Sequence, residues 1–305
     1  MKHTYDMSQQ EVDNIVARFG QDFYDRAVRN LAVYGEQWGL SHFKLIPHFS
    51  ASLVFTCHSA QDGEAVLKIG HPNSRELATE YYALDEYNGN RFCKVYQADL
   101  QGGVFLEEYI QPGDPLRNEP SLDIRLAVFC DVYQGLHIPA ANLEMYPAYK
   151  DWVYRITNYM STRHEYSELY LKMKRAKDIF DAVSTLYTGK VLLHGDLHHG
   201  NMLTNSNGGY TLIDPKGVIG DPIYDTPRFI LNEFENEVTP ALQSKISHII
   251  STLASELNIP SDILKQCLYV EMTMAVCWCV EDGADDEFLS RLMESITLAE
   301  LLMES

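Results

Sequence analysis

The sequence predicts an α+β fold with two lobes, a small antiparallel β lobe followed by a larger, mainly helical lobe. Three observations support this fold class. Short apolar patterns typical of strands crowd into residues 41–110, and long helical patterns dominate from about residue 121. Between them, the run Gln-Pro-Gly-Asp-Pro at 111–115 breaks regular structure and is the best linker candidate. We therefore expect an N-terminal lobe over 1–110 and a C-terminal lobe over 111–305.

The N-terminal lobe is expected to begin with helices and to continue as a sheet. Ser8 and Glu11 form a capping box that starts a first helix. A second helical stretch runs over 23–38, so residues 1–40 form a helical extension. Apolar patterns separated by turn residues predict five short strands, near 45–46, 52–57, 64–69, 93–98 and 104–109. A helix over 73–89 follows the third strand of this mainly antiparallel sheet.

The C-terminal lobe is expected to be helical with one strand-rich interruption. Helical periodicity and capping residues predict helices over about 121–137, 149–163, 167–188, 239–257, 260–281 and 286–303. The helix over 260–281 is apolar almost all round, so it should be buried. Residues 191–214 contain short strands around the turn at 205–209. Two lobes imply a cleft between them, and such clefts are favoured ligand sites.

Composition and charge exclude several classes of protein. The chain has 305 residues and a formal net charge of −19, so we expect no nucleic-acid or membrane partner, although a cationic ligand would be attracted. Solubility alone also explains this charge. None of the six cysteines falls in a Cys-x-x-Cys motif, which argues against a zinc knuckle or a disulfide framework. No signal peptide and no stretch of membrane-spanning length are recognised, so we expect a cytoplasmic monomer or homodimer.

The densest group of polar residues lies at 194–201, after an apolar strand, and reads His-Gly-Asp-Leu-His-His-Gly-Asn. Asp196 and Asn201 bracket a tight loop, and Asp214 follows thirteen residues later at the end of a hairpin. Asn201 and Asp214 offer the oxygen ligands that magnesium prefers. Asp196 then remains to accept a proton or orient a hydroxyl, and His194 would orient the loop backbone. This arrangement suits phosphoryl transfer, which depends on positioning and charge neutralisation.

Two other interpretations of this loop stay open. Asp196 alone could be a turn or helix-cap residue. His194, His198 and His199 could instead bind a transition metal, which would indicate a metal-dependent hydrolase. The sequence favours neither, because the spacing from Asp196 to Asn201 matches a kinase catalytic loop and the histidines lack helical spacing with a glutamate.

A lysine in an apolar strand indicates a nucleotide site in the first lobe. Lys68 lies on the third predicted strand, where burial of its charge is costly unless the charge is used. Glu80, in the helix that follows, is the expected partner, although a lysine on an exposed edge strand is the alternative. Ser50 and Ser52 lie on a loop that would cover phosphates, and it lacks a glycine-rich motif. The segment from Glu108 to Ile110 would contact adenine through its backbone.

These stretches carry a resemblance to a known family. They read Glu-Ala-Val-Leu-Lys at 64–68, Leu-His-Gly-Asp-Leu-His-His-Gly-Asn at 193–201, Ile-Asp-Pro-Lys-Gly at 213–217, Gly-Asp-Pro-Ile-Tyr-Asp at 220–225 and Glu-Asp-Gly at 281–283. The chain resembles the aminoglycoside phosphotransferases, which share the protein-kinase-like fold. More narrowly, it is similar to the aminoglycoside/hydroxyurea antibiotic resistance kinases, whose best-known members are streptomycin 6-kinases.

The resemblance implies an enzyme that uses ATP and Mg²⁺. Asp196 would be the catalytic base, Asn201 and Asp214 would bind magnesium, and Lys68 would bind the nucleotide phosphates. Lys216 stands where a protein kinase has a different residue, and it is as well suited to a structural ion pair as to a phosphate contact. The acceptor implied is a hydroxyl of a cationic aminocyclitol such as streptomycin, with another hydroxylated amine or hydroxyurea as the alternative.

Acidic residues of the second lobe are the candidates for binding that acceptor. Glu281 and Asp282 end the apolar helix over 260–281 and could bind ammonium or guanidinium groups. A solvated acidic turn is the simpler alternative. Asp221 and Asp225 either line the same site or are structural. A nucleotide-binding module without activity is a further alternative. Such a module would be expected to lack at least one of four polar residues, and all four are present here: Lys68, Asp196, Asn201 and Asp214.

Overall fold

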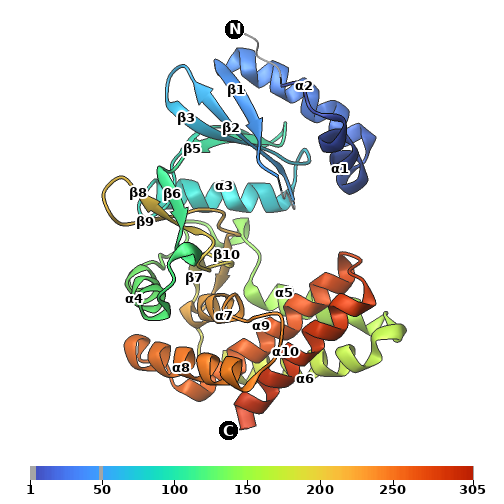
Figure 1. Cartoon of the computed structure of the whole chain (residues 1–305), viewed down its shortest axis with the longest axis vertical. Coiled ribbons are helices and arrows are strands. Elements are labelled where there is room, and N and C mark those ends of the chain that lie inside the picture. Colours follow the sequence, from blue (N-terminus) through green and yellow to red (C-terminus); the bar gives the residue numbers. More distant parts are fainter. Residues whose placement is uncertain (1–4, 48–50, 305) are drawn as a thin grey trace. The chain divides into compact units, whose positions relative to one another are not determined.

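The computed structural model describes residues 5–47 and 51–304 and divides into two compact units. The first comprises Met1–Gly113 with Leu203–Ile213, and the second comprises Asp114–Met202 with Asp214–Ser305. The first therefore includes the hairpin over 203–213, which the sequence analysis placed in the C-terminal lobe. Figure 1 shows the elements of each unit.

The first unit is built on a five-stranded antiparallel sheet with strand order β1-β2-β3-β5-β4. Its strands are β1 (Leu40–Leu45), β2 (Leu53–Ser59), β3 (Gly63–Ile69), β4 (Val95–Asp99) and β5 (Val104–Glu108). Its helices are α1 (Gln9–Phe19), α2 (Gln21–Gln37) and α3 (Arg75–Tyr87). The sheet and the inserted helix were predicted, but the first strand begins five residues earlier than expected.

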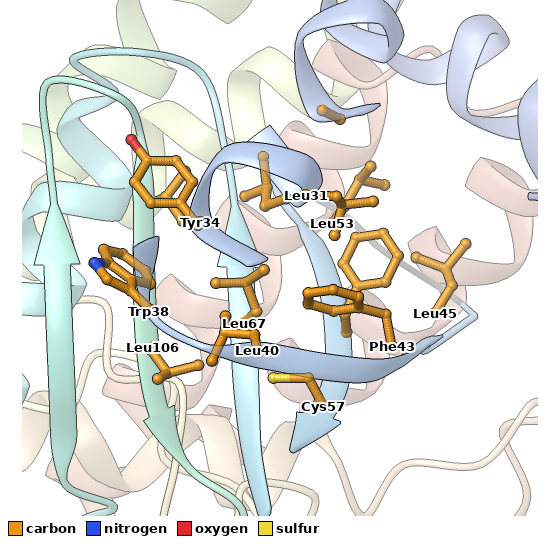
Figure 2. Close-up of a cluster of buried hydrophobic side chains, with 14 of the residues drawn as sticks. Leu31, Tyr34, Trp38, Leu40, Phe43, Leu45, Leu53, Cys57, Leu67 and Leu106 are labelled. Carbon is orange, nitrogen blue, oxygen red and sulfur yellow. The ribbon is translucent and has the colours of Figure 1, made fainter. Parts of the chain in front are cut away.

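Alternation of side chains along β3 and β5 gives the two faces of this sheet different roles. Leu67 and Leu106 join one apolar cluster with residues of α1 and α2, part of which Figure 2 shows. Lys68 is the neighbour of Leu67 on β3, Phe105 is the neighbour of Leu106 on β5, and the two pair in register. Because successive side chains of a strand alternate, Lys68 and Phe105 point to the opposite face of the sheet. There, the Phe105 ring lies 6.4 Å from that of Tyr81 on α3. The face that carries Lys68 is thus the one that α3 covers.

The second unit is mainly helical and has α9 at its centre. Its long helices are α4 (Leu122–Tyr133), α5 (Tyr149–Ser161), α6 (Ser167–Ser184), α8 (Pro240–Leu257), α9 (Ser261–Glu281) and α10 (Asp286–Glu304). Helix α9 packs against α5, α6, α8 and α10, as well as the short α7 (Thr226–Leu231). The predicted burial of this helix is confirmed, since most of its residues are inaccessible to solvent.

Burial explains why α9 is so apolar. By length and composition this helix could cross a membrane, although the sequence analysis recognised no stretch of that length. Within the most apolar window of α9, 67% is buried against the rest of the protein. Its composition is therefore that of a helix in the core of a folded unit.

Two short sheets connect the segments that carry the candidate catalytic residues. β7 (Val191–Leu193) pairs antiparallel with β10 (Val218–Gly220). A three-stranded sheet has the order β6-β8-β9, with β6 (Pro112–Pro115), β8 (Met202–Asn205) and β9 (Tyr210–Leu212). The expectation that the segment over 111–115 has no regular structure was wrong, because β6 is a strand. Pairing with β8 gives it a backbone partner that its composition does not reveal.

Candidate active site

Lys68 forms a buried ion-pair cluster in the first unit. Its ammonium group bonds to the carboxylate of Glu80 on α3, and its Nζ lies 3.1 Å from Oε1 of Glu107. The side chain of Lys68 is only 5% exposed, so pairing of this kind is needed to offset the loss of hydration. The predicted pairing of Lys68 with Glu80 is confirmed. The contact of Lys68 with nucleotide phosphate stays a prediction.

Glu107 is a member of this cluster that the sequence analysis missed. It pairs with Val66 in the β3–β5 register, two positions from the pair of Phe105 with Lys68, and therefore shares the face of Lys68. The Sγ of Cys93 also lies 3.6 Å from its Oε2 and donates to it. Alternation along β5 would have placed Glu107 on this face, but only once the pairing of β5 with β3 was known.

The other nucleotide candidates lie around the same sheet. Ser50 falls outside the described residues, and Ser52 is half-buried just before β2. Glu108 ends β5, and its Oε2 accepts a hydrogen bond of 3.2 Å from the backbone N–H of Lys94. Ile110 is buried in the segment that follows β5. The roles of these residues toward phosphate and adenine stay predictions.

The catalytic-loop candidates follow β7 in the second unit and are held by Asp225. The backbone N–H groups of His194 and Gly195 donate to its two carboxylate oxygens, at 2.9 and 2.7 Å. His137 Nε2 lies 3.0 Å from the same carboxylate. Asp225 is 0% exposed and both of its oxygens have partners, which corrects the alternative that it binds substrate. Its role is to fix the backbone that leads into Asp196.

Asp221 is also engaged within the fold. Its Oδ1 accepts from the N–H of Ile223 at 3.2 Å and caps the 3-10 helix η4 (Pro222–Asp225). Its Oδ2 accepts from the N–H of Gly189 at 2.9 Å. These bonds support the structural alternative for Asp221, and binding of an acceptor by this residue stays a prediction.

One hydrogen bond closes the loop over 194–201 of this unit, and another joins this loop to the segment over 214–216. The side-chain nitrogen of Asn201 donates to the carbonyl oxygen of Asp196 at 3.1 Å. The N–H of Lys216 donates to the carbonyl oxygen of His194 at 2.7 Å. Asp214, two residues before Lys216, has a φ of 58°, a left-handed conformation that aspartate tolerates better than most residues. Because the amide nitrogen of Asn201 is engaged in this bond, its oxygen is the atom suited to a cation.

Asp196 lies in a charged environment that favours its ionised form. Burial raises the pKa of this carboxyl, but the charge of Arg228, followed by His198 and Lys216, outweighs it and lowers the pKa below its usual value. The Nε of Arg228 lies 3.6 Å from Oδ1 of Asp196. Arg228 was not predicted from the sequence. The one indication that it lies near this loop is its position three residues after Asp225.

The histidines of the loop are engaged in hydrogen bonds that hold its shape. Nδ1 of His194 accepts from the N–H of Asp196 at 3.2 Å, and Nδ1 of His198 accepts from the N–H of Gly200 at 2.9 Å. Nε2 of His199 lies 3.0 Å from the carbonyl oxygen of Asn232. Across residues 5–47 and 51–304, no three histidine, cysteine or acidic side chains are grouped to hold a metal ion. The transition-metal interpretation therefore lacks support, and His194 has the loop-orienting position expected of it.

Glu281 and Asp282 lie at the exposed end of α9. Glu281 forms a bidentate ion pair with Arg155, in which the two carboxylate oxygens lie 2.6 and 3.0 Å from the guanidinium nitrogens. Asp282 is exposed and follows the last residue of the helix. A cationic acceptor would have to compete with Arg155 for Glu281, so binding by these acids stays a prediction.

Comparison with known proteins assigns the family. Residues 37–283 match the family described as aminoglycoside/hydroxyurea antibiotic resistance kinase. The chain belongs to this family. As an aminoglycoside/hydroxyurea resistance kinase, it is a phosphotransferase with a hydroxyl group as acceptor, and it has the protein-kinase-like fold.

Individual relatives of this resistance kinase are distant. Hydroxyurea phosphotransferase from Kitasatospora aureofaciens is 26% identical over 269 residues, covering 87% of this chain and 76% of that protein. Streptomycin 3''-kinase from Klebsiella pneumoniae is 23% identical over 233 residues, covering 73% of this chain and 82% of that protein. A solved aminoglycoside phosphotransferase in a ternary complex with ADP and hygromycin B has a TM-score of 0.59 and 14% identity, covering 89% of this chain and 97% of that one.

Proposed function

We propose that this kinase transfers the γ-phosphate of ATP, with Mg²⁺, to a hydroxyl of a cationic aminocyclitol such as streptomycin. The observation that carries the proposal is the loop of Asp196. Its backbone is fixed by Asp225 at 2.9 and 2.7 Å, and its carboxylate is held in the ionised form beside Arg228. A carboxylate fixed in this way suits the orientation of an acceptor hydroxyl.

Magnesium fits the oxygen ligands that this unit offers. Mg²⁺ prefers one or two carboxylates completed by substrate phosphates and water. Asp214 supplies a carboxylate and Asn201 an amide oxygen, so these two residues would hold the ion. When bound, the ion neutralises negative charge on the phosphates. Lys68, held by Glu80 and Glu107, would contact nucleotide phosphate.

Asp196 would act on the acceptor more by positioning than by basicity. The hydroxyl oxygen forms a bond to the γ-phosphorus, the bond to the β–γ bridging oxygen breaks, and the hydroxyl proton passes to Asp196. A carboxyl whose pKa is lowered is a weak base at neutral pH, and general-base catalysis contributes roughly 10²–10⁴-fold. The main contribution of Asp196 is therefore to hold the hydroxyl in line with the phosphate.

Hydroxyurea is the second candidate acceptor. A hydroxyurea phosphotransferase is among the relatives, at 26% identity against 23% for the streptomycin 3''-kinase. Hydroxyurea is small and uncharged, so it would not need the acidic end of α9. Neutralising Glu281 with glutamine should therefore raise KM for streptomycin and leave KM for hydroxyurea unchanged.

The test is a coupled assay of ADP release with streptomycin, other aminocyclitols and hydroxyurea. We expect turnover that requires ATP, Mg²⁺ and an acceptor, and a loss of roughly 10²–10⁴-fold in kcat for Asp196→Ala. Phosphorus NMR of the product would identify the hydroxyl that is modified. If no aminocyclitol raises turnover while hydroxyurea does, the first acceptor assignment is wrong. If neither does, both acceptor assignments are wrong.

A further inference from the structure

A partly buried arginine lies near both the carboxylate of Asp196 and that of Glu271. Arg228 is on α7, and its Nε lies 3.6 Å from Oδ1 of Asp196 and 2.7 Å from Oε1 of Glu271. Its side chain is 19% exposed. The Nε is buried yet makes no well-aligned hydrogen bond within the described residues. The guanidinium therefore pairs closely with Glu271 and also faces the carboxylate of Asp196.

Glu271 and Trp278 hold the side chain of Arg228 in place. Glu271 is 2% exposed at the centre of α9, and its second oxygen accepts a hydrogen bond from the hydroxyl of Tyr149. The Arg228 guanidinium also lies 5.3 Å from the centre of the Trp278 ring, within the range of a cation–π contact. Because Glu271 is held by the core, Arg228 presents a positive charge to Asp196 at a fixed position.

A second ion pair of this unit, between Arg125 and Glu233, has a different geometry from the contacts of Arg228. The side chains of Arg125 and Glu233 are 12% and 3% exposed, and they pair through two hydrogen bonds of 2.7 Å. Arg228 instead has one close contact with Glu271, through Nε at 2.7 Å, and the same Nε lies 3.6 Å from the carboxylate of Asp196. His198 cannot replace this charge, since burial lowers its pKa to about 4 and leaves the ring neutral near pH 7.

We propose that Arg228 is a positioning residue for Asp196, anchored by Glu271 and holding the carboxylate in the orientation that receives the acceptor hydroxyl. The inference rests on the proposed function of Asp196. Asp225 fixes the backbone of the loop, whereas Arg228 fixes the side chain. The two residues therefore have separable effects.

The kinetic test compares Arg228→Ala and Arg228→Lys with Arg175→Ala as the matched control. Arg175 also contacts a glutamate, Glu300 at 2.8 Å, and an aromatic ring of α9, but it lies outside the catalytic loop. We expect Arg228→Ala to lose roughly 10²-fold in kcat with little change in KM for ATP. Lysine, or guanidinium added at low millimolar concentration, should restore part of this loss. Arg175→Ala should keep wild-type kcat.

Two results would overturn the inference. One is a wild-type kcat in Arg228→Ala. The other is a loss that neither lysine nor guanidinium restores and that follows a loss of thermal stability. A crystal structure of Arg228→Ala gives a readout that does not depend on turnover. The Asp196 carboxylate should change its rotamer while the backbone of His194 and Gly195 stays on Asp225. An unmoved carboxylate contradicts the inference, whereas absence of turnover in the wild type contradicts only the proposed function.

Discussion

Lys68 shares its single positive charge between two acidic side chains in the interior of the first unit. Glu80 approaches from α3 and Glu107 from β5, and the side chains of Lys68 and Glu107 are only 5% and 4% exposed. Removing one partner of a buried ion pair is costly, because the charge left behind stays in a medium that solvates it poorly. Lys68 should therefore stabilise the fold in addition to its proposed role toward the nucleotide.

This arrangement predicts a stability effect that a second substitution relieves. Lys68→Met removes the cation that faces Glu107 and should lower the free energy of unfolding by about 3–5 kcal/mol. Adding Glu107→Gln removes one of the two buried negative charges and should recover part of that loss. Urea unfolding at neutral pH measures both variants.

The exposed pair of Arg155 and Glu281 is the control, since these side chains are 54% and 33% exposed. Glu281→Gln should change the free energy of unfolding by less than about 1 kcal/mol. Strictly additive effects of Lys68→Met and Glu107→Gln would show that the two residues are not coupled.

At the scale of residues, the sequence revealed the side chains that belong to a local pattern. Asp196 and Asn201 have the spacing of a catalytic loop, and Lys68 is conspicuous in an apolar strand. Glu107 and Arg228 were not predictable in this way. Each acts through a neighbour that is distant in sequence, so its role depends on strand register or on helix packing.

At the scale of elements, the turn after β7 is constrained by both conformation and space. Gly195 has a φ of 78°, in the left-handed region that other residues rarely adopt. A Cβ atom at this position would lie 2.9 Å from Val218 Cγ1 and 3.0 Å from the ring of Trp152. The loop thus needs glycine for its backbone and for the close approach of β10 and α5.

Gly195→Ala should therefore destabilise the second unit more than the same change at an open glycine. Gly135 has a φ of 75°, and a Cβ there would meet nothing within 4 Å, so it isolates the conformational cost. We expect Gly195→Ala to cost roughly 1–3 kcal/mol more than Gly135→Ala, since overpacking adds to the strain. Chemical denaturation of both variants measures the difference. Equal losses would show that the space around Gly195 is not limiting.

The long elements and the short strands β7, β8 and β9 were predictable, whereas the short strands β6 and β10 were not. Helix α9 carries a long run of apolar residues, and β2 alternates clearly between buried and more exposed residues. Strands β6 and β10 have four and three residues, too few for a recognisable period, and β6 begins and ends with proline. Their strand conformation comes from pairing with β8 and β7, which no local pattern encodes.

At the scale of the whole molecule, the chain combines a large negative charge with chemistry on a negatively charged nucleotide. The formal net charge is −19, so the proposed function requires the phosphates to be attracted locally, and we propose Lys68 and a magnesium ion at Asn201 and Asp214 for this role. A net negative protein also favours a cationic acceptor, in agreement with the proposed aminocyclitol. The cytoplasmic location and the monomeric or homodimeric state remain predictions from the sequence.

The central claim is that Asp196 acts on the acceptor while Asp214 acts on the metal–nucleotide complex. The most direct measurement is calorimetric titration with MgATP, together with phosphoryl transfer, for wild type, Asp196→Ala and Asp214→Asn. Asparagine tolerates the left-handed backbone at position 214, which makes it the conservative choice. We predict that Asp196→Ala binds MgATP as wild type does but loses transfer, whereas Asp214→Asn loses the affinity that magnesium contributes. Wild-type transfer by Asp196→Ala, or unchanged MgATP affinity in Asp214→Asn, would contradict the account.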